Sequence, residues 1–280
     1  MPVARPFEGL AGEAEWIALR ELVPSATAPL RPADPAYADR SVTLATVLPL
    51  ALPAIVRSDG RILIGLQVHS HSGDASRDVA HALEQALAAE PGTMLPSTGL
   101  PGPGPRLQDL LDTTVALLPT LHTDFGFWLD GLDNGDGQGA GVDAQSAEVQ
   151  ASMERANNAI APTTRLSTVE AAYWCQIADK THLRWVAPYD EDPLLDALAR
   201  LGAVRELGLG DGTKYAGSFR AHGRLVPVWD LPADEPAERW DEPVARFAER
   251  LAAAMAVDTP LTDAERRARD GLRGRQLTLR

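Results

Sequence analysis

Three residues in the second half of the chain have types and spacing that suit nucleophilic catalysis: Cys175, His182 and Asp190. Cys175 lies on a predicted strand and His182 on the strand that follows it, so a hairpin could bring the thiol and the imidazole into contact. The run from Tyr173 to Cys175 is also typical of a buried core strand, in which a lone cysteine behaves as a small hydrophobe. We therefore favour a core position for Cys175 and keep the catalytic interpretation as the alternative.

His69, His71 and Asp74 form the pattern that best suits a metal site. Residues two positions apart share one face of a strand, so both imidazoles could bind one metal ion, and Asp74 could add an oxygen. The spacing departs from the metallo-β-lactamase motif, because the aspartate comes one residue too late and no histidine follows it. We favour a polar strand end in which Ser72 or Asp74 caps the next helix, and we expect no cofactor.

His122 and Asp124 lie at a tight turn and could form an acid–base pair. Thr123 and Asp124 also suit the capping of a turn, which explains the same letters without chemistry. We favour the turn and keep the acid–base pair as the alternative.

Several short motifs that carry chemistry are absent from the sequence. It contains no G-x-x-x-x-G-K-[ST], no G-x-S-x-G, no H-E-x-x-H and no G-x-G-x-x-G at the start of a helix. These absences argue against a nucleotide hydrolase, an α/β-hydrolase, a zincin and a Rossmann dehydrogenase. We therefore expect a protein that is not an enzyme, with the catalytic alternatives above left open.

Positive charge is concentrated at the C-terminus of an otherwise acidic chain. The 280 residues include 26 basic and 39 acidic side chains, for a net charge of −13. Clustered arginines can neutralise phosphates, so the tail is a candidate contact for RNA or a ribosome, whereas the acidic remainder argues against general nucleic-acid binding. The other interpretation is a helix capped by Thr262 and Glu265, whose arginines suit the helix dipole. The candidate partner-binding residues are Arg266, Arg267, Arg269, Arg273 and Arg275.

Composition predicts a globular cytoplasmic protein. Hydrophobic residues make up 45% of the chain, which is enough apolar surface for folding. Cys175 is the single cysteine, which excludes an intrachain disulfide and a multi-cysteine zinc site. The longest uncharged apolar stretch, between Arg40 and Arg57, is shorter than the roughly 20 residues of a membrane span. The N-terminus has no apolar core of the kind a signal peptide needs, so we expect no membrane partner.

Hydrophobic periodicity divides the chain into a leading helix and four units, each with two β-prone runs and a helix. Antiparallel hairpins combined with helices imply an α+β fold. The expected helices are 13–23, 74–90, 106–111, 146–160, 192–201 and 243–255. The expected strand pairs are 42–56 with 61–68, 115–118 with 125–129, 171–177 with 182–186, and 215–219 with 224–229.

A segment rich in Gly and Asp separates the predicted elements into two halves. The turns at 57–61 and 220–224 share letters, which leaves an internal duplication and convergent turn chemistry as alternatives. The expected organisation is an N-terminal α+β half at 1–130, a linker or loop at 131–145, a C-terminal α+β half at 146–260 and an arginine-rich tail at 261–280.

Several longer runs resemble a known family. They are RPFEGL from Arg5, WIALRELVP from Trp16, EAAYWC from Glu170, THLRWV from Thr181, SFRAHG from Ser218, VPVWDLP from Val226 and RQLTLR from Arg275. Over essentially its whole length the chain is similar to the actinobacterial domain-of-unknown-function family numbered 5926. Members sometimes carry a preprotein translocase SecA or topoisomerase II label, which this sequence does not support, since a SecA motor needs a phosphate-binding loop. The resemblance implies kinship but no particular activity.

These observations favour a non-catalytic module that binds an unidentified protein partner. One alternative is an enzyme that uses Cys175 and His182, or a metal ion bound by His69 and His71. The other alternative is an RNA- or ribosome-associated factor that acts through the arginine-rich tail.

Overall fold

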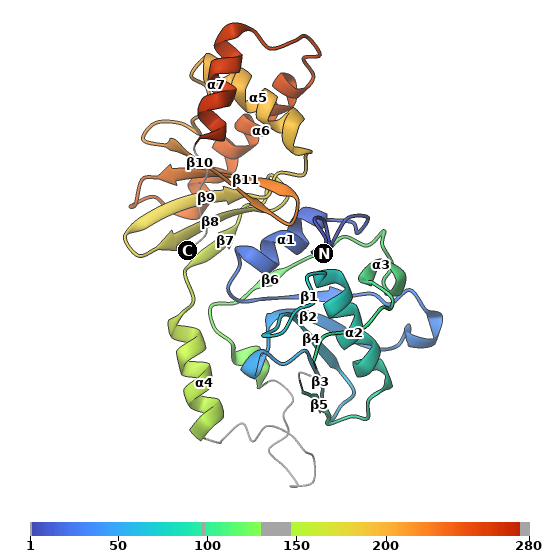
Figure 1. Cartoon of the computed structure of the whole chain (residues 1–280). Helices are drawn as coiled ribbons and strands as arrows, with labels where there is room; N and C mark the ends of the chain where they lie inside the picture. Colours follow the sequence, from blue (N-terminus) through green and yellow to red (C-terminus); the bar gives the residue numbers. More distant parts are fainter. Residues whose placement is uncertain (1, 97–98, 130–146, 275–280) are drawn as a thin grey trace. The chain divides into compact units, whose positions relative to one another are not determined.

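The computed structural model describes residues 2–96, 99–129 and 147–274 and shows a mixed α+β protein, as expected (Figure 1). The chain divides into two compact units, Met1–Ile160 and Ala161–Arg280, and each is described by itself. The predicted linker, 131–145, lies outside the described residues.

A six-stranded mixed sheet forms the centre of the first unit. Its spatial order is β5-β3-β4-β2-β1-β6, in which β2 and β4 run parallel and the other neighbours antiparallel. Nearly every residue of β4 is buried, as is typical of a central strand paired in parallel. The strands are β1 (Ala26–Leu30), β2 (Val42–Val47), β3 (Ala54–Val56), β4 (Ile62–Gln67), β5 (Met94–Leu95) and β6 (Thr120–Leu121).

The predicted strand 42–56 is two strands in the structure, β2 and β3, separated by the short 3-10 helix η2 (Pro49–Ala51). Pro49 lacks a backbone donor, and Leu50 and Ala51 adopt positive φ angles of 55° and 50°, a left-handed geometry that a regular strand does not contain. Strand β2 therefore pairs in parallel with β4, and β3 alone forms the antiparallel hairpin with β4. The sequence predicts the hairpin turn but not the break.

The second predicted strand pair, 115–118 with 125–129, is wrong. The first run contains no strand, and the second forms the 3-10 helix η3 (Gly126–Trp128). Asp124 Oδ1 accepts a hydrogen bond from the Gly126 backbone N–H at 2.7 Å, which favours a turn over an extended chain. The rings of Phe125 and Trp128 lie 4.5 Å apart in a buried cluster, so these residues serve the core without entering the sheet.

Helices of the first unit pack against its sheet and its aromatic cluster. Helix α2 contacts β3 and β4, and Val79, Leu83 and Ala86 are buried on its inner face. Met153 and Ala156 of α4 pack against the cluster of Phe125 and Trp128, so α4 belongs to the first unit, whereas the sequence analysis grouped it with the second half. Besides η2 and η3, the helices of this unit are α1 (Glu13–Glu21), η1 (Pro35–Tyr37), α2 (Ala75–Ala88), α3 (Leu107–Leu110) and α4 (Ala147–Asn158).

The second unit contains a five-stranded antiparallel sheet with the spatial order β10-β11-β9-β8-β7. The hairpins predicted for this half are present as β8–β9 and β10–β11, each with short turns between alternating apolar runs. The strands are β7 (Thr163–Arg165), β8 (Ala172–Ile177), β9 (Lys180–Trp185), β10 (Lys214–Ala221) and β11 (Arg224–Leu231).

Three helices pack together on one face of this second sheet (Figure 1). Leu194, Leu198 and Leu201 of α5 are buried, as their helical spacing predicts. In the same core the rings of Trp229 and Phe247 meet edge to face at 5.0 Å. These three helices are α5 (Glu191–Ala203), α6 (Asp241–Met255) and α7 (Asp263–Arg273), and the short 3-10 helix η4 (Ala237–Trp240) precedes α6.

Candidate functional site

Cys175, His182 and Asp230 form one row across three neighbouring strands of the second sheet. Cys175 on β8 lies opposite His182 on β9, and His182 lies opposite Asp230 on β11. Directly opposed residues of antiparallel strands point to the same face, so the three side chains share one face. His182 Nδ1 lies 3.1 Å from Asp230 Oδ1. The carboxylate beside the imidazole is thus Asp230, a residue that the sequence analysis did not select.

Asp190, the carboxylate selected from the sequence, has a different position. It precedes the first turn of α5, and its Oδ1 accepts a hydrogen bond from Arg224 Nη1 at 3.0 Å. The predicted set of Cys175, His182 and Asp190 is therefore wrong in its carboxylate, because Asp230 and not Asp190 lies beside His182. The pairing of β11 with β9 brings Asp230 to His182, and no local pattern near either residue reveals this long-range register.

Burial makes the thiol in this row a poor nucleophile. Cys175 is 3% exposed, and burial raises the pKa of its thiol, an effect that Arg184 opposes only in part. The pKa of His182 is lowered, first by burial and further by Arg184 and Lys180, although Asp230 raises it. Within the described residues no hydrogen bond joins the Cys175 thiol to His182. At neutral pH the row therefore contains a protonated thiol and a neutral imidazole, not the ion pair of an activated cysteine.

The metal-site candidates do not converge. His69 and His71 are exposed, whereas the Asp74 carboxylate caps α2 by accepting the backbone N–H groups of Ser76 and Arg77. No group of three His, Cys, Asp or Glu side chains within the described ranges is placed to hold a metal ion. The structure thus shows the helix cap that the sequence favoured.

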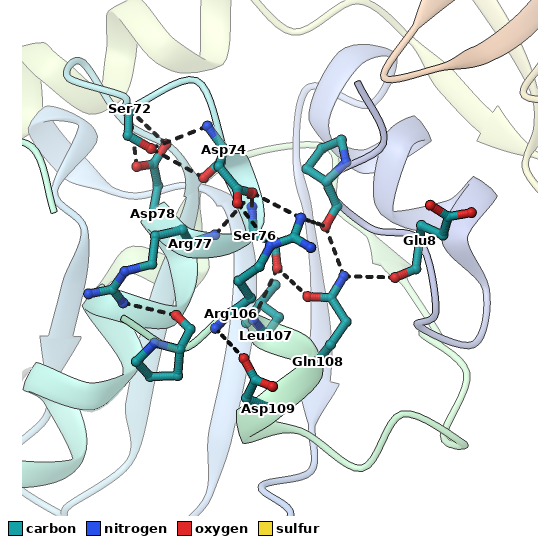
Figure 2. Close-up of polar contacts among 12 residues, drawn as sticks. Glu8, Ser72, Asp74, Ser76, Arg77, Asp78, Arg106, Leu107, Gln108 and Asp109 are labelled. Atoms are coloured by element: carbon teal, nitrogen blue, oxygen red, sulfur yellow. Dashed lines mark hydrogen bonds and ion pairs between the residues drawn. The ribbon is translucent and has the colours of Figure 1, made fainter. Parts of the chain in front are cut away.

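Asp74 belongs to a larger polar network that joins α2, α3 and the N-terminal segment (Figure 2). Arg106 Nε lies 2.8 Å from Asp74 Oδ2, and Arg106 Nη2 donates to Asp74 Oδ1 at 3.2 Å. The Ser76 hydroxyl donates to Gln108 Oε1 at 2.7 Å and accepts the Leu107 N–H at 3.0 Å. Gln108 Nε2 in turn donates to the carbonyl oxygens of Pro6 and Glu8. Each of these side chains has partners within the protein, which indicates a structural role for the network.

His122 and Asp124 engage different neighbours. His122 Nε2 lies 2.8 Å from the Thr27 hydroxyl, and its ring lies 4.9 Å from that of Phe127. The Asp124 carboxylate accepts the Gly126 N–H, so it holds the turn before η3. The contacts match the turn that the sequence favoured, and neither residue contacts the other through a hydrogen bond in the described structure.

Three of the candidate arginines are engaged within the second unit. Arg266 binds Asp263 and the carbonyl oxygen of Leu261. Arg269 lies 2.6 Å from Asp192 Oδ1 and 2.7 Å from Asp196 Oδ1 on α5, and Arg273 lies 3.5 Å from Asp192 Oδ1. Arg267 is exposed, and Arg275 lies outside the described residues. The capping box of Thr262 and Glu265 is present at the start of α7.

The described residues define a two-unit α+β protein in which Cys175 is buried, Asp74, His122 and Asp124 are held in structural contacts, and His69 and His71 are exposed. No helix in the part of the chain that the structure describes is long and apolar enough to cross a membrane. A family model matches residues 6–280, and the chain belongs to the family of unknown function DUF5926. This match confirms the resemblance found in the sequence. No curated protein and no solved structure matches the chain.

Proposed function

We propose that the chain is a cytoplasmic protein that binds a partner and catalyses no reaction of its own. The observation that carries this proposal is the state of Cys175, the strongest nucleophile candidate. Its thiol is buried with a raised pKa, and the nearest aligned base, His182, is held beside Asp230. Binding needs no reactive group, and a net charge of −13 gives the chain a long-range preference for basic partners.

Thiol reactivity tests the state of Cys175 directly. We expect 5,5′-dithiobis(2-nitrobenzoate) to react with the folded chain roughly tenfold or more slowly than with the chain unfolded in guanidinium, because only an accessible thiolate reacts. A Cys175→Ser chain that carries Ser72→Cys, at an exposed position, is the control and should react rapidly while folded. A folded wild-type chain that reacts as fast as this control would contradict the proposal.

Partner capture tests the binding function itself. The tagged wild-type chain and a Cys175→Ser/His182→Gln chain are each incubated with host lysate, and the retained proteins are compared. We expect the same proteins on both chains, since neither side chain is needed for binding. Retention that requires Cys175, or no specific retention by either chain, would count against a binding module.

A thiol-dependent enzyme is the second candidate, and one observation favours it. The order Cys175, His182, Asp230 across three strands places a carboxylate where it orients the imidazole, as in acid–base-assisted thiol catalysis. A turnover lost in both Cys175→Ser and Asp230→Asn would establish this candidate and overturn the first. The RNA alternative has less support, because Arg266, Arg269 and Arg273 have acidic partners.

A further inference from the structure

A groove opens between the first turns of α5 and the connection from α6 to α7. It contains about 750 Å³ of space that protein atoms do not fill, part of it open to solvent. One wall is formed by α5 and the other by residues 255–261, all within the described part of the second unit. The candidate residues in the sequence analysis did not include this connection.

The two walls are joined and are partly apolar. Arg200 Nη2 on α5 donates to the Thr259 carbonyl oxygen at 2.6 Å, which fixes the connection against the helix. Pro193, Met255 and Val257 contribute apolar surface to the groove, and Val257 is 43% exposed. A ligand that covers exposed aliphatic surface beside an open groove lowers the free energy, because it removes apolar area from water.

Three carboxylates and the Arg200 guanidinium give the groove its polar character. Asp192 and Asp196 are one helical turn apart on α5, so they share a face, and Asp258 lies on the opposite wall. The contacts from Arg269 and Arg273 end on the Oδ1 atoms of Asp192 and Asp196. Each carboxylate has further acceptor positions on its second oxygen.

Asp258 is exposed and has no ion pair within the described residues. A cationic side chain that enters the groove therefore meets an unpaired carboxylate, Asp258, beside the exposed Val257. Arg200 also lines the groove, and Arg269 and Arg273 pair with Asp192 and Asp196, so Asp258 is the lining carboxylate without a cationic partner in the described structure.

We propose that this groove binds a segment of a basic protein partner in which an arginine side chain stands beside aliphatic side chains. This inference rests on the proposed function and names its site. The guanidinium binds the Asp258 carboxylate, and the aliphatic groups cover Pro193, Met255 and Val257. The net charge of −13 speeds the approach of a basic partner.

The probe is an acetylated and amidated pentapeptide, Leu-Arg-Leu-Arg-Leu, added to the 15N-labelled full chain and followed by NMR. We expect saturable shifts at residues 192–200 and 255–261 at peptide concentrations up to about 1 mM, the range of weak peptide contacts. The same peptide with glutamate in place of arginine should give no such shifts. Absence of shifts, shifts elsewhere, or equal shifts with both peptides would overturn the proposal.

Two pairs of matched variants locate the contact. Asp258→Asn should weaken peptide binding about threefold and Val257→Ser about fivefold, whereas Asp211→Asn and Val204→Ser, exposed positions outside the groove, should leave it unchanged. Unchanged binding in the groove variants would overturn the assignment. A chain that ends at Gly274 and binds the peptide more tightly than the full chain would show that the chain's own C-terminal residues compete for the groove. That result would also overturn the assignment of the groove to a partner.

The proposed function and this inference fail in different ways. A lysate partner could bind the wild type and the Asp258→Asn/Val257→Ser chain equally. This result would support the binding function and would show that the groove is not the binding site. A turnover that depends on Cys175 would contradict the proposed non-catalytic function, whether or not the peptide binds to the groove.

Discussion

His182 lies beside one carboxylate and two cations, and this environment makes the stability of the chain depend on pH. Its folded-state pKa is lowered below the ordinary value of 6.5. The unfolded chain therefore binds more protons at this residue as the pH drops from about 6.5 through the folded-state pKa, so the free energy of unfolding falls across that window. We expect His182→Gln to remove the part of this decrease in the free energy of unfolding that comes from His182. Urea midpoints measured between about pH 7 and pH 5 test this.

Two variants separate the role of His182 from that of other titrating groups. His71→Gln is the control substitution, because it replaces a histidine that is exposed and lies in the first unit. Asp230→Asn removes the carboxylate that raises the pKa of His182, so the folded-state pKa of His182 should fall further. The free energy of unfolding of this variant should therefore keep decreasing to a lower pH than that of the wild type. A His182→Gln chain whose midpoint follows wild type at every pH would refute the assignment.

At the scale of elements, Arg269 of α7 bridges two carboxylates of α5. Arg269 contacts Asp192 and Asp196, and its side chain is 23% exposed. We expect Arg269→Gln to cost about 0.5–2 kcal/mol in total and to increase amide hydrogen exchange in α7, since each such pair contributes about 0.2–1 kcal/mol.

Arg267 provides the matched control for this prediction. It lies two residues earlier on the same helix and is exposed, so Arg267→Gln removes the same charge and should leave exchange in α7 at the wild-type rate. Equal effects of the two substitutions would show that the net charge of the helix, and not the bridge to α5, sets its stability. RNA binding through the tail would instead make Arg267 important for retention on RNA.

Local patterns predicted those elements that local interactions determine. The β8–β9 and β10–β11 hairpins have short turns between alternating runs, and Asp74 caps α2 through a contact two residues away. Residues 125–129 have an equally apolar composition, yet Asp124 turns the chain into η3. Apolar composition alone does not distinguish a strand from a buried turn.

The candidate site was predictable only in part, for the same reason. The opposition of Cys175 and His182 follows from one hairpin and could be anticipated. Asp230 reaches His182 through the pairing of β11 with β9, and Arg106 reaches Asp74 from a separate helix. Such contacts depend on the packing of distant segments, which a single sequence without a structure does not specify.

At the scale of the whole molecule, the chain has two compact units with separate buried clusters. Phe247 lies in a cluster formed wholly by the second unit, and Leu48 in one formed wholly by the first. Truncating Phe247 to alanine removes a fully buried ring and should cost about 3–5 kcal/mol. We expect hydrogen exchange to increase mainly within residues 161–274, because the lost contacts are made there.

Leu48→Ala supplies the reciprocal experiment, with an expected cost of about 2–5 kcal/mol and faster exchange mainly within residues 2–129 and 147–160. Hydrogen exchange followed by mass spectrometry resolves both patterns in the full chain, so neither unit has to be isolated. If either variant accelerated exchange uniformly from one end of the chain to the other, the two units would unfold as one cooperative body. A local response to each substitution would show instead that the two clusters contribute to separate cooperative units, which a partner bound to one unit could stabilise selectively.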